Sequence, residues 1–294
     1  MRRSAPATEI DHRVPPSAED RIRALQQPFF IPYSLAEAID TRLTRLLEHP
    51  RLQRMPNLVI VGGTNNGKSM IVERFYRHHP PTDNPHGDTL LLPVLLIQSP
   101  PGPDEGRLYN KVLEGLFAPF GVTTHPDKKF RQIKTLLTAL DTRLLVIDEF
   151  HHLLSGPVSK QRYYLNALKH LGTELRLPVV AVGTEQALAA LSSDPQMANR
   201  FEPVLLPKWQ LNEEFQRLLV TLERRLQLHH DSTLAEPTLA AKILALSEGT
   251  IGEVVALRRR AAEYAIRTGE ERITAHTLNA IVWTLPSERN RQRA

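Results

Sequence analysis

Residues 57–69 read NLVIVGGTNNGKS, and this stretch decides the fold that we expect. Its second part, from Gly62 to Ser69, fits the phosphate-loop pattern G-x-x-x-x-G-K-S/T. Its first part is a run of aliphatic and β-branched residues, which is typical of a buried strand. Residues 69–78 then predict a helix, so the loop stands in the strand–loop–helix setting that the pattern requires. The sequence therefore predicts a phosphate-binding site, in preference to a chance glycine-rich turn.

The residues of this loop have separable roles in binding ATP and Mg²⁺, the two cofactors that we predict. Glycines let the backbone curl so that successive N–H groups face the phosphates, and the helix N-terminus adds favourable partial charge. Lys68 is expected to reach the β- and γ-phosphates and to take part in catalysis, and the Ser69 hydroxyl is expected to ligate the metal. The predicted cofactor-binding residues of this segment are Gly62, Gly63, Thr64, Asn65, Asn66, Gly67, Lys68, Ser69 and Met70.

A second motif places two acids at the end of another buried strand. Residues 144–149 read LLVIDE, so four aliphatic residues lead directly into Asp148 and Glu149. In a parallel sheet, ligands bind at the carboxyl ends of the strands. Asp148 is expected to hold the hydrated Mg²⁺, and Glu149 to polarise the attacking water. A solvated acidic strand end is the alternative, and the phosphate loop makes it the weaker one.

Two further polar residues are candidates for catalysis. Thr184 follows a strand pattern at residues 178–182, where its hydroxyl would contact the γ-phosphate or orient water; a helix N-cap is an equal alternative. Arg200 stands after this strand, within Asn199-Arg200-Phe201. It is either a surface arginine or an arginine finger that reaches the ATP of a neighbouring subunit.

Strand-like and helix-like segments alternate from residue 57 to residue 206. Aliphatic runs at residues 57–63, 89–98, 144–147, 178–182 and 204–206 predict strands, the last of them at a sheet edge. Segments with apolar residues at helical spacing lie between them. We therefore predict an α/β fold of the P-loop NTPase class, with a parallel sheet flanked by helices.

The pattern changes after Pro207, because the four apolar-periodic segments that follow all read as helices. We predict four regions: a disordered N-terminal tail over residues 1–24, an ATPase domain with an N-terminal helical segment over 25–206, a small all-helical lid over 207–285, and a basic C-terminal tail over 286–294.

Bulk composition excludes several classes of protein. The chain has no cysteine, which excludes disulfides and cysteine metal sites. No apolar run approaches the roughly 20 residues of a membrane span, and no secretory signal is visible, so we expect a cytoplasmic protein with no membrane partner. A net charge of +5 permits nucleic-acid binding without requiring it.

The order of the motifs (phosphate loop, Asp-Glu strand end, polar strand end, arginine, helical lid) resembles that of the AAA+ ATPases, over roughly residues 25–285. A finer resemblance is to the transposition ATPases of the TniB and TnsC kind. The segments that carry it are FIPY at 30–33, SPP at 99–101, DEGRLY at 104–109, DEFHHLL at 148–154, KQR at 160–162, LNAL at 165–168, VGT at 182–184 and EGTIGE at 248–253.

This resemblance implies a function. Such proteins oligomerise on duplex DNA when ATP is bound, as rings or helical filaments, without sequence specificity. They recruit and activate a transposase, in some systems together with a TniQ-like targeting protein. Hydrolysis of ATP to ADP and phosphate then disassembles the oligomer. The resemblance therefore implies an ATP-dependent, DNA-binding regulator of transposition.

The resemblance also implies roles for particular residues. Ile31 and Tyr33 would lie near the adenine, Thr184 would be the sensor of the γ-phosphate, and Arg200 would be the finger. Many AAA+ lids carry an arginine at the fourth place of Gly-x-x-Arg, whereas this chain has Gly252 there. A lid arginine that contacts ATP in the same chain is therefore not expected, although Gly252 itself stays among the predicted cofactor-binding positions.

Basic residues outside these motifs are the candidates for DNA contacts. In a ring, the loops after the early strands line the central channel, as the AAA+ resemblance implies. Contacts from them to phosphates would be independent of sequence and sensitive to salt. The candidates are Arg107, Lys111, Lys128, Lys129, Lys160 and Arg162, with Arg107 and Lys129 preferred. Each taken singly is more often a solvated charge.

Three other groups of residues are interpreted as structural or solvated. The pairs His151-His152 and His229-His230 show no spacing typical of a metal site, so we interpret them as structural or surface residues. Residues 258–260 are three arginines, interpreted as a solvated helix face rather than a basic patch.

Two other functions remain open on the sequence. One is a different AAA+ machine, such as a helicase loader or a protein remodeller. The other is a signalling ATPase that uses nucleotide as a switch and does not bind DNA. Salt-sensitive assembly on duplex DNA separates the transposition regulator from the switch, and direct binding of a transposase separates it from the loader.

Overall fold

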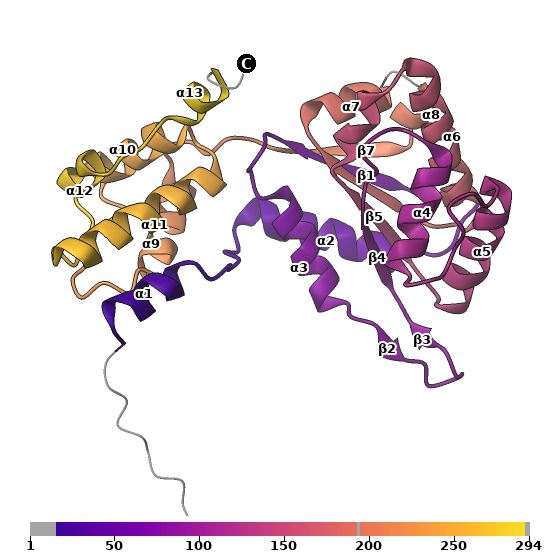
Figure 1. The fold of residues 1–294 in the computed structure, drawn as a ribbon, viewed down its shortest axis with the longest axis horizontal. Helices are drawn as coiled ribbons and strands as arrows, with labels where there is room; N and C mark the ends of the chain where they lie inside the picture. The colour runs from indigo at the N-terminus through magenta and orange to yellow at the C-terminus, as the bar shows by residue number, and fades with distance from the viewer. Residues whose placement is uncertain (1–15, 193–194, 292–294) are drawn as a thin grey trace, which may run out of the picture. The chain divides into compact units, whose positions relative to one another are not determined.

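The computed structural model describes residues 16–192 and 195–291, which form two compact units (Figure 1). The sheet unit consists of Pro32–Trp209 together with Thr250–Gly252. The helical unit consists of the chain up to Ile31, Gln210–Gly249, and the chain from Glu253 onward. Among the described residues, no helix is both long enough and apolar enough to span a membrane.

A parallel five-stranded sheet is the centre of the first unit. Its strands are β1 (Asn57–Gly62), β4 (Val94–Gln98), β5 (Leu144–Asp148), β6 (Val179–Gly183) and β7 (Phe201–Leu206), in the order β4-β5-β6-β1-β7. The register pairs Ile60 with Val182 and Ile147 with Ala181. The inner strands β5 and β6 are buried along their whole length, as the aliphatic runs predicted.

Helices cover both faces of this sheet (Figure 1). α2 (Ser34–Leu47) packs against α3 (Lys68–His78) on one side. α4 (Glu105–Gly115) packs against α5 (Pro126–Ala139) and α6 (Val158–Glu174) on the other. The apolar faces of α4, α5 and α6 and one face of the sheet form one core, in which Phe150 and Tyr164 are completely buried. Two short helices, α7 (Glu185–Ser192) and α8 (Pro195–Ala198), lead from β6 to β7. The predicted α/β class is confirmed.

The strand predicted over residues 89–98 is divided in the structure. Leu90–Leu91 forms β3, which pairs antiparallel with β2 (Thr82–Asp83) in a separate two-stranded sheet, and β4 begins only at Val94. Pro93 lies at the break, because proline has no N–H to donate to a ladder. Its carbonyl instead accepts hydrogen bonds from the N–H groups of Arg143 and Leu144, at 2.9 and 3.1 Å.

The helical unit contains α9 (Glu213–Glu223), α10 (Pro237–Ser247), α12 (Ala275–Ala280), α13 (Pro286–Arg291) and, from Glu253 onward, α11 (Ile251–Thr268). The tail predicted over residues 286–294 is therefore helical as far as Arg291, and its last three residues lie outside the described part of the chain. Arg258 was interpreted as solvated, and the structure corrects this: its side chain is buried and donates to the Leu222 carbonyl at 3.1 Å. Burial lowers the pKa of Arg258 to about 10.

The N-terminal tail predicted over residues 1–24 is also corrected, for its last seven residues; residues 1–15 lie outside the described range. Ala18–Leu25 forms α1, which Ser17 caps and which belongs to the helical unit. Ile22 and Leu25 are buried, and Arg21 donates two hydrogen bonds to the Glu271 carboxylate at 2.7 and 2.8 Å. This partner lies 250 residues away in sequence, so local patterns gave no sign of it.

We predict that Arg21→Ala destabilises the helical unit by about 2 kcal/mol, because it removes two charge-assisted hydrogen bonds from the partly buried Glu271 carboxylate. Thermal and chemical unfolding measure the change. Hydrogen bonds from Arg21 hold the pKa of Glu271 below the usual range of a glutamate, so this stabilisation is present above that range and is lost as the pH falls through the lowered pKa. The matched control is Arg23→Ala on the same helix, whose exposed side chain makes only a 3.5 Å ion pair with Asp20. Equal destabilisation by both variants would contradict the account.

Candidate nucleotide-binding site

The phosphate loop connects β1 to α3 at the carboxyl edge of the sheet. Two residues of the loop, Asn65 and Gly67, have left-handed backbone conformations, with φ of +60° and +84°. Asparagine and glycine are the residues that adopt this conformation most readily. α3 begins directly after Gly67, so the backbone N–H groups of the first helical turn point into the loop. This geometry suits an anion at the helix N-terminus.

The end of β7 holds this loop in place. A Cβ atom on Gly62 would lie 2.9 Å from the Leu206 carbonyl oxygen, so only glycine fits where the two strands approach. The Asn66 side-chain amide donates to the carbonyls of Leu206 and Pro207, at 2.9 and 3.1 Å. The loop is therefore anchored to the edge strand β7, of which the sequence pattern predicted only residues 204–206.

Lys68 is buried at the centre of the site. Its Nζ atom donates to the carbonyls of Gly62 and Gly63, at 2.9 and 2.7 Å. Burial lowers the pKa of Lys68, while the negative charges of Glu149 and Asp148 oppose that shift. The structure thus brings the lysine of the first motif to the acids of the second, across 80 residues of sequence.

The acids emerge where β5 ends. Asp148 is buried, and its backbone carbonyl accepts from the Ser99 N–H at 2.7 Å. Glu149 takes a left-handed conformation with φ +54°, and its N–H donates to Asp148 Oδ1 at 2.7 Å. A left-handed conformation is costly for a glutamate, and residues held in such conformations concentrate at functional sites. The turn directs the two adjacent carboxylates differently: that of Asp148 is buried, and that of Glu149 is half-exposed.

Thr184 follows the strand that separates the two motifs, since β6 lies between β1 and β5. Its Oγ1 atom is buried and has no hydrogen-bond partner among the described residues. Buried hydroxyls are usually bonded, so this atom fits a role toward a bound group. The oxygen-only donor set of Ser69 and Asp148 likewise fits Mg²⁺, which prefers hydroxyl, carboxylate and water ligands.

The two residues expected near the adenine belong to different units. Tyr33 lies in the sheet unit and packs edge-on against Trp209, with ring centroids 5.1 Å apart. Ile31 is buried and belongs to the helical unit. The sequence analysis did not single out Trp209; the available signal was its position two residues after Pro207, where the pattern changes.

Gly252 contacts the phosphate loop directly. Its N–H donates to the Asn65 carbonyl at 3.0 Å, and a Cβ atom here would clash with the Asn65 side chain. The neighbouring Ile251 side chain touches the position that a Cβ on Gly67 would occupy. The glycine that replaces the lid arginine of many AAA+ proteins is thus the residue that fits against this loop.

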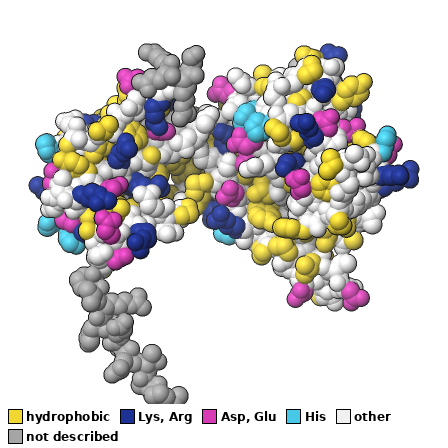
Figure 2. All heavy atoms as spheres, viewed as in Figure 1, with side chains coloured by type: hydrophobic (Ala, Val, Ile, Leu, Met, Phe, Trp, Pro, Cys, Tyr) yellow, Lys and Arg dark blue, Asp and Glu magenta, His cyan; other side chains and the backbone are white. Residues whose placement is uncertain are grey.

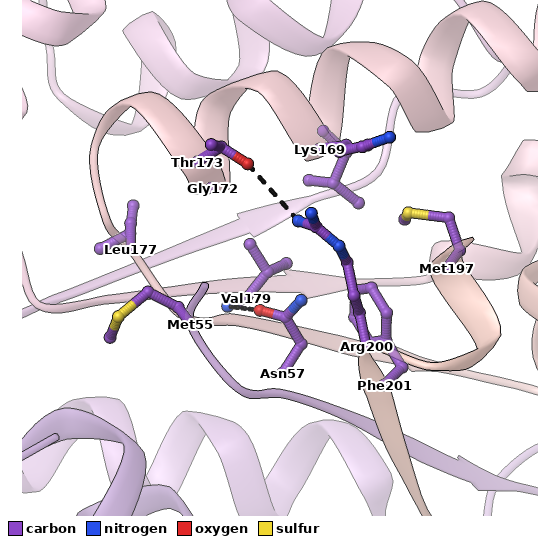
Figure 3. A pocket seen from close by; sticks show the side chains of 11 residues that line it. Met55, Asn57, Lys169, Gly172, Thr173, Leu177, Val179, Met197, Arg200 and Phe201 are labelled. Atoms are coloured by element: carbon purple, nitrogen blue, oxygen red, sulfur yellow. Dashed lines mark hydrogen bonds between the residues drawn. The ribbon is translucent and has the colours of Figure 1, made fainter. Parts of the chain in front are cut away.

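Arg200 lies at the opposite end of the sheet from the phosphate loop. Its carbonyl accepts from the Asn57 N–H, at the first residue of β1, and β1 runs about 17 Å from there to Gly62. Figure 3 shows its guanidinium beside α6, where it donates to Thr173 Oγ1 at 3.4 Å, in a small pocket lined also by Met55, Lys169 and Met197. Arg200 therefore does not reach the phosphate loop of its own chain.

The candidate DNA contacts divide into free and engaged side chains. The prediction for Lys129 is wrong, because the side chain is only 2% exposed, donates to the Val122 carbonyl at 3.0 Å and lies over the Phe120 ring. Lys111 pairs with Glu114 at 2.7 Å. Arg107, Lys128, Lys160 and Arg162 are exposed. Figure 2 shows basic and acidic side chains mixed over the visible face rather than gathered in one patch.

The turn after the acids brings together three groups that the sequence spacing did not connect. Donor atoms of Glu149, His151 and His152 all lie within 4.8 Å of one another. In the second histidine pair, His229 Nδ1 lies 3.6 Å from the Glu271 carboxylate, which is already bound to Arg21. The two pairs therefore differ in their surroundings.

We predict that Gly252→Ala lowers nucleotide affinity roughly tenfold, because the added methyl group displaces Asn65 and distorts the phosphate loop. Calorimetric titration with ADP measures it. The second-site variant Asn65→Gly removes the clashing side chain and should restore most of the affinity. Unchanged affinity in the single variant would show that the contact does not shape the loop.

Comparisons with solved structures identify the fold. The chain is similar to the Aeropyrum pernix ORC2 protein in ADPNP–ADP complexes, with a TM-score of 0.61 and 17% identity over 87% of this chain and 70% of that one. It is similar to the Aeropyrum pernix ORC1 protein in complex with DNA, with a TM-score of 0.61 and 17% identity over 88% and 68% of the two chains. Drosophila ORC bound to DNA matches with a TM-score of 0.55 and 16% identity over 94% and 69%. At these identities the likeness shows the fold, that of the AAA+ P-loop ATPases.

The sequence comparisons identify the family. No curated protein matches the sequence. The family model described as the bacterial TniB protein matches residues 21–211, a stretch that contains the phosphate loop, both acids, Thr184 and Arg200. With about two thirds of its length matched to that model, this chain belongs to the TniB family of AAA+ ATPases.

Proposed function

We propose that this TniB-family chain is an ATPase that assembles on duplex DNA in its ATP-bound form and regulates transposition. One observation carries the ATPase part: Lys68, Asp148, Glu149 and Thr184 come from three different strand ends and converge on one edge of the sheet. Family membership supports the transposition part, since the matched model is that of TniB.

Each residue has a role that follows from its position. Backbone N–H groups of residues 62–69 hold the phosphates, and Lys68 turns from the carbonyls of Gly62 and Gly63 to the β- and γ-phosphates. Ser69 and Asp148 would hold Mg²⁺, which neutralises charge on the β- and γ-phosphate oxygens. Glu149 orients the attacking water, and the Thr184 hydroxyl contacts the γ-phosphate.

Arg200 completes the site of a neighbouring copy. It lies about 17 Å from its own phosphate loop, so any contact it makes with ATP is made in another subunit. The guanidinium leaves Thr173 at the cost of a single long hydrogen bond and stabilises charge on the transferred phosphoryl group. Hydrolysis therefore depends on a homo-oligomer, either a ring or a helical filament.

DNA is bound through its phosphates. Arg107, Lys128, Lys160 and Arg162 supply exposed positive charge for contacts that do not read sequence. Two of the structural relatives, ORC1 and Drosophila ORC, are described with DNA, which supports a DNA-associated chain of this fold. The assembled form recruits a transposase, in some systems with a TniQ-like protein, and hydrolysis disassembles it.

We predict opposite effects for two variants of the nucleotide site. Lys68→Ala should abolish ATP binding and, with it, ATP-dependent association with DNA. Glu149→Gln should retain ATP binding, lower hydrolysis at least about 100-fold and prolong residence on DNA. Fluorescence anisotropy of a labelled duplex, followed after dilution into competitor DNA, measures both. Normal turnover by Glu149→Gln would remove Glu149 from its role, and ATP-independent DNA binding by Lys68→Ala would refute the coupling.

We predict that Arg200→Ala leaves ATP affinity unchanged and lowers hydrolysis roughly 1,000-fold, because a finger acts on the transition state. Mixing Arg200→Ala with Lys68→Ala subunits should restore part of the activity, since one supplies an intact phosphate loop and the other an intact finger. Arg77→Ala, an exposed arginine near the end of α3 that pairs with Glu73 on the same helix at 3.3 Å, is the control. No recovery in the mixture would argue against action between subunits.

A further inference from the structure

The turn that follows the catalytic acids carries a second, different set of donor atoms. Glu149 Oε2 and His151 Nε2 lie 3.3 Å apart, and a donor atom of His152 lies within 4.8 Å of both. All three side chains are partly exposed, so a small ion from solvent reaches them. We propose that Glu149, His151 and His152 form a binding site for a transition-metal ion such as Zn²⁺, separate from the Mg²⁺ site.

The spacing of the donor atoms fits a tetrahedral ion. Zinc bonds nitrogen and oxygen at about 2.0–2.1 Å, which places neighbouring ligand atoms about 3.3–3.4 Å apart. The separation between Glu149 Oε2 and His151 Nε2 matches this value. The third donor, on His152, lies within 4.8 Å of the other two and moves inward on binding, and water fills the fourth position.

Hydrogen bonding selects which ring nitrogens are free to ligate. His152 Nδ1 lies 3.4 Å from the Ser99 carbonyl oxygen, which only accepts, so the ring hydrogen lies on Nδ1 and the lone pair on Nε2. A carbonyl partner of this kind is the usual outer support of a metal-ligating histidine. His151 Nδ1 is buried, which leaves Nε2, the atom facing Glu149, as its accessible donor. In the metal-bound form the His151 ring hydrogen lies on Nδ1.

The backbone presents these groups in a fixed arrangement. The turn is a 3₁₀ helix, Phe150–Ser155, whose Phe150 and Leu153 side chains are buried in the core. Phe150 packs edge-on against Tyr164, with ring centroids 6.0 Å apart. The Ser155 hydroxyl donates to the Pro101 carbonyl at 2.7 Å and ties the turn to the loop after β4. The three donors therefore need little reorganisation to bind an ion.

The donor set discriminates between cations. Two imidazoles and one carboxylate suit Zn²⁺, Co²⁺ or Ni²⁺, whereas Mg²⁺ prefers oxygen ligands and keeps several waters. An ion here takes the Glu149 carboxylate away from the attacking water and leaves the phosphate loop untouched. On the proposed function, the site arrests hydrolysis without releasing ATP, and so prolongs the assembled state.

Calorimetric titration of the full chain with Zn²⁺, without nucleotide and in excess Mg²⁺, tests the site itself. We expect one Zn²⁺ per chain with micromolar affinity, weakened at least about tenfold in both His152→Ala and Glu149→Gln. Co²⁺ should give the visible absorption of a tetrahedral complex. His230→Ala, in the second histidine pair, is the matched control and should bind as the wild type does. No saturable binding, or unchanged affinity in His152→Ala, would overturn the proposal.

A second measurement separates this proposal from the proposed function. With free Zn²⁺ fixed by a metal buffer, ATP hydrolysis by the wild type should fall over the same concentration range as binding, and His152→Ala should be insensitive. Zinc binding that depends on His152 but leaves hydrolysis unchanged would overturn the regulatory role. A chain that binds zinc in this way yet hydrolyses no ATP in its absence would keep the metal site and refute the ATPase.

Discussion

The order of strands in the parallel sheet is the constraint on which the site depends. Only β6 separates β1 from β5, so the phosphate loop and the acid pair emerge at the same edge about two strand spacings, roughly 10 Å, apart. Thr184 fills the position between them. The aliphatic strands β5 and β6 are buried along their whole length and therefore occupy the interior of the sheet beside β1. The packing of the buried strands thus determines which polar residues meet at the carboxyl edge of the sheet.

Close contacts at two glycines and a strained backbone at Glu149 determine the detailed geometry of this edge. Gly62 and Gly252 let β7 and the start of α11 contact the loop, where any side chain would collide. Glu149 is held in a left-handed conformation by Phe150 and Leu153, which are buried directly after it. At this turn the Asp148 carboxyl group is buried, whereas the Glu149 carboxyl group is partly exposed. The same turn holds donor atoms of Glu149, His151 and His152 within 4.8 Å of one another, so it carries both the proposed hydrolytic group and the proposed donor set.

The sequence predicted what local patterns encode. The phosphate loop, the acid pair and the alternation of strands and helices each lie within a short stretch, and the α/β class followed from them. Features that depend on distant contacts were missed or misjudged. α1 is stabilised by Glu271, which lies 250 residues further on, and Lys129 is satisfied by the carbonyl of Val122 instead of by solvent. The convergence of Glu149 with two histidines depends on a positive φ angle, which residue spacing does not reveal.

The central claim is that ATP bound at this edge is completed by Arg200 of a second copy, and that DNA supports this assembly. Electron microscopy of the purified chain with duplex DNA and a non-hydrolysable ATP analogue, compared with a sample without nucleotide, tests it most directly. The account predicts rings or filaments on the duplex only when the nucleotide is present, with Arg200 of one subunit at the phosphates of the next. Dispersed protein without DNA association at low salt, or an assembly in which Arg200 faces away from the nucleotide, would contradict it.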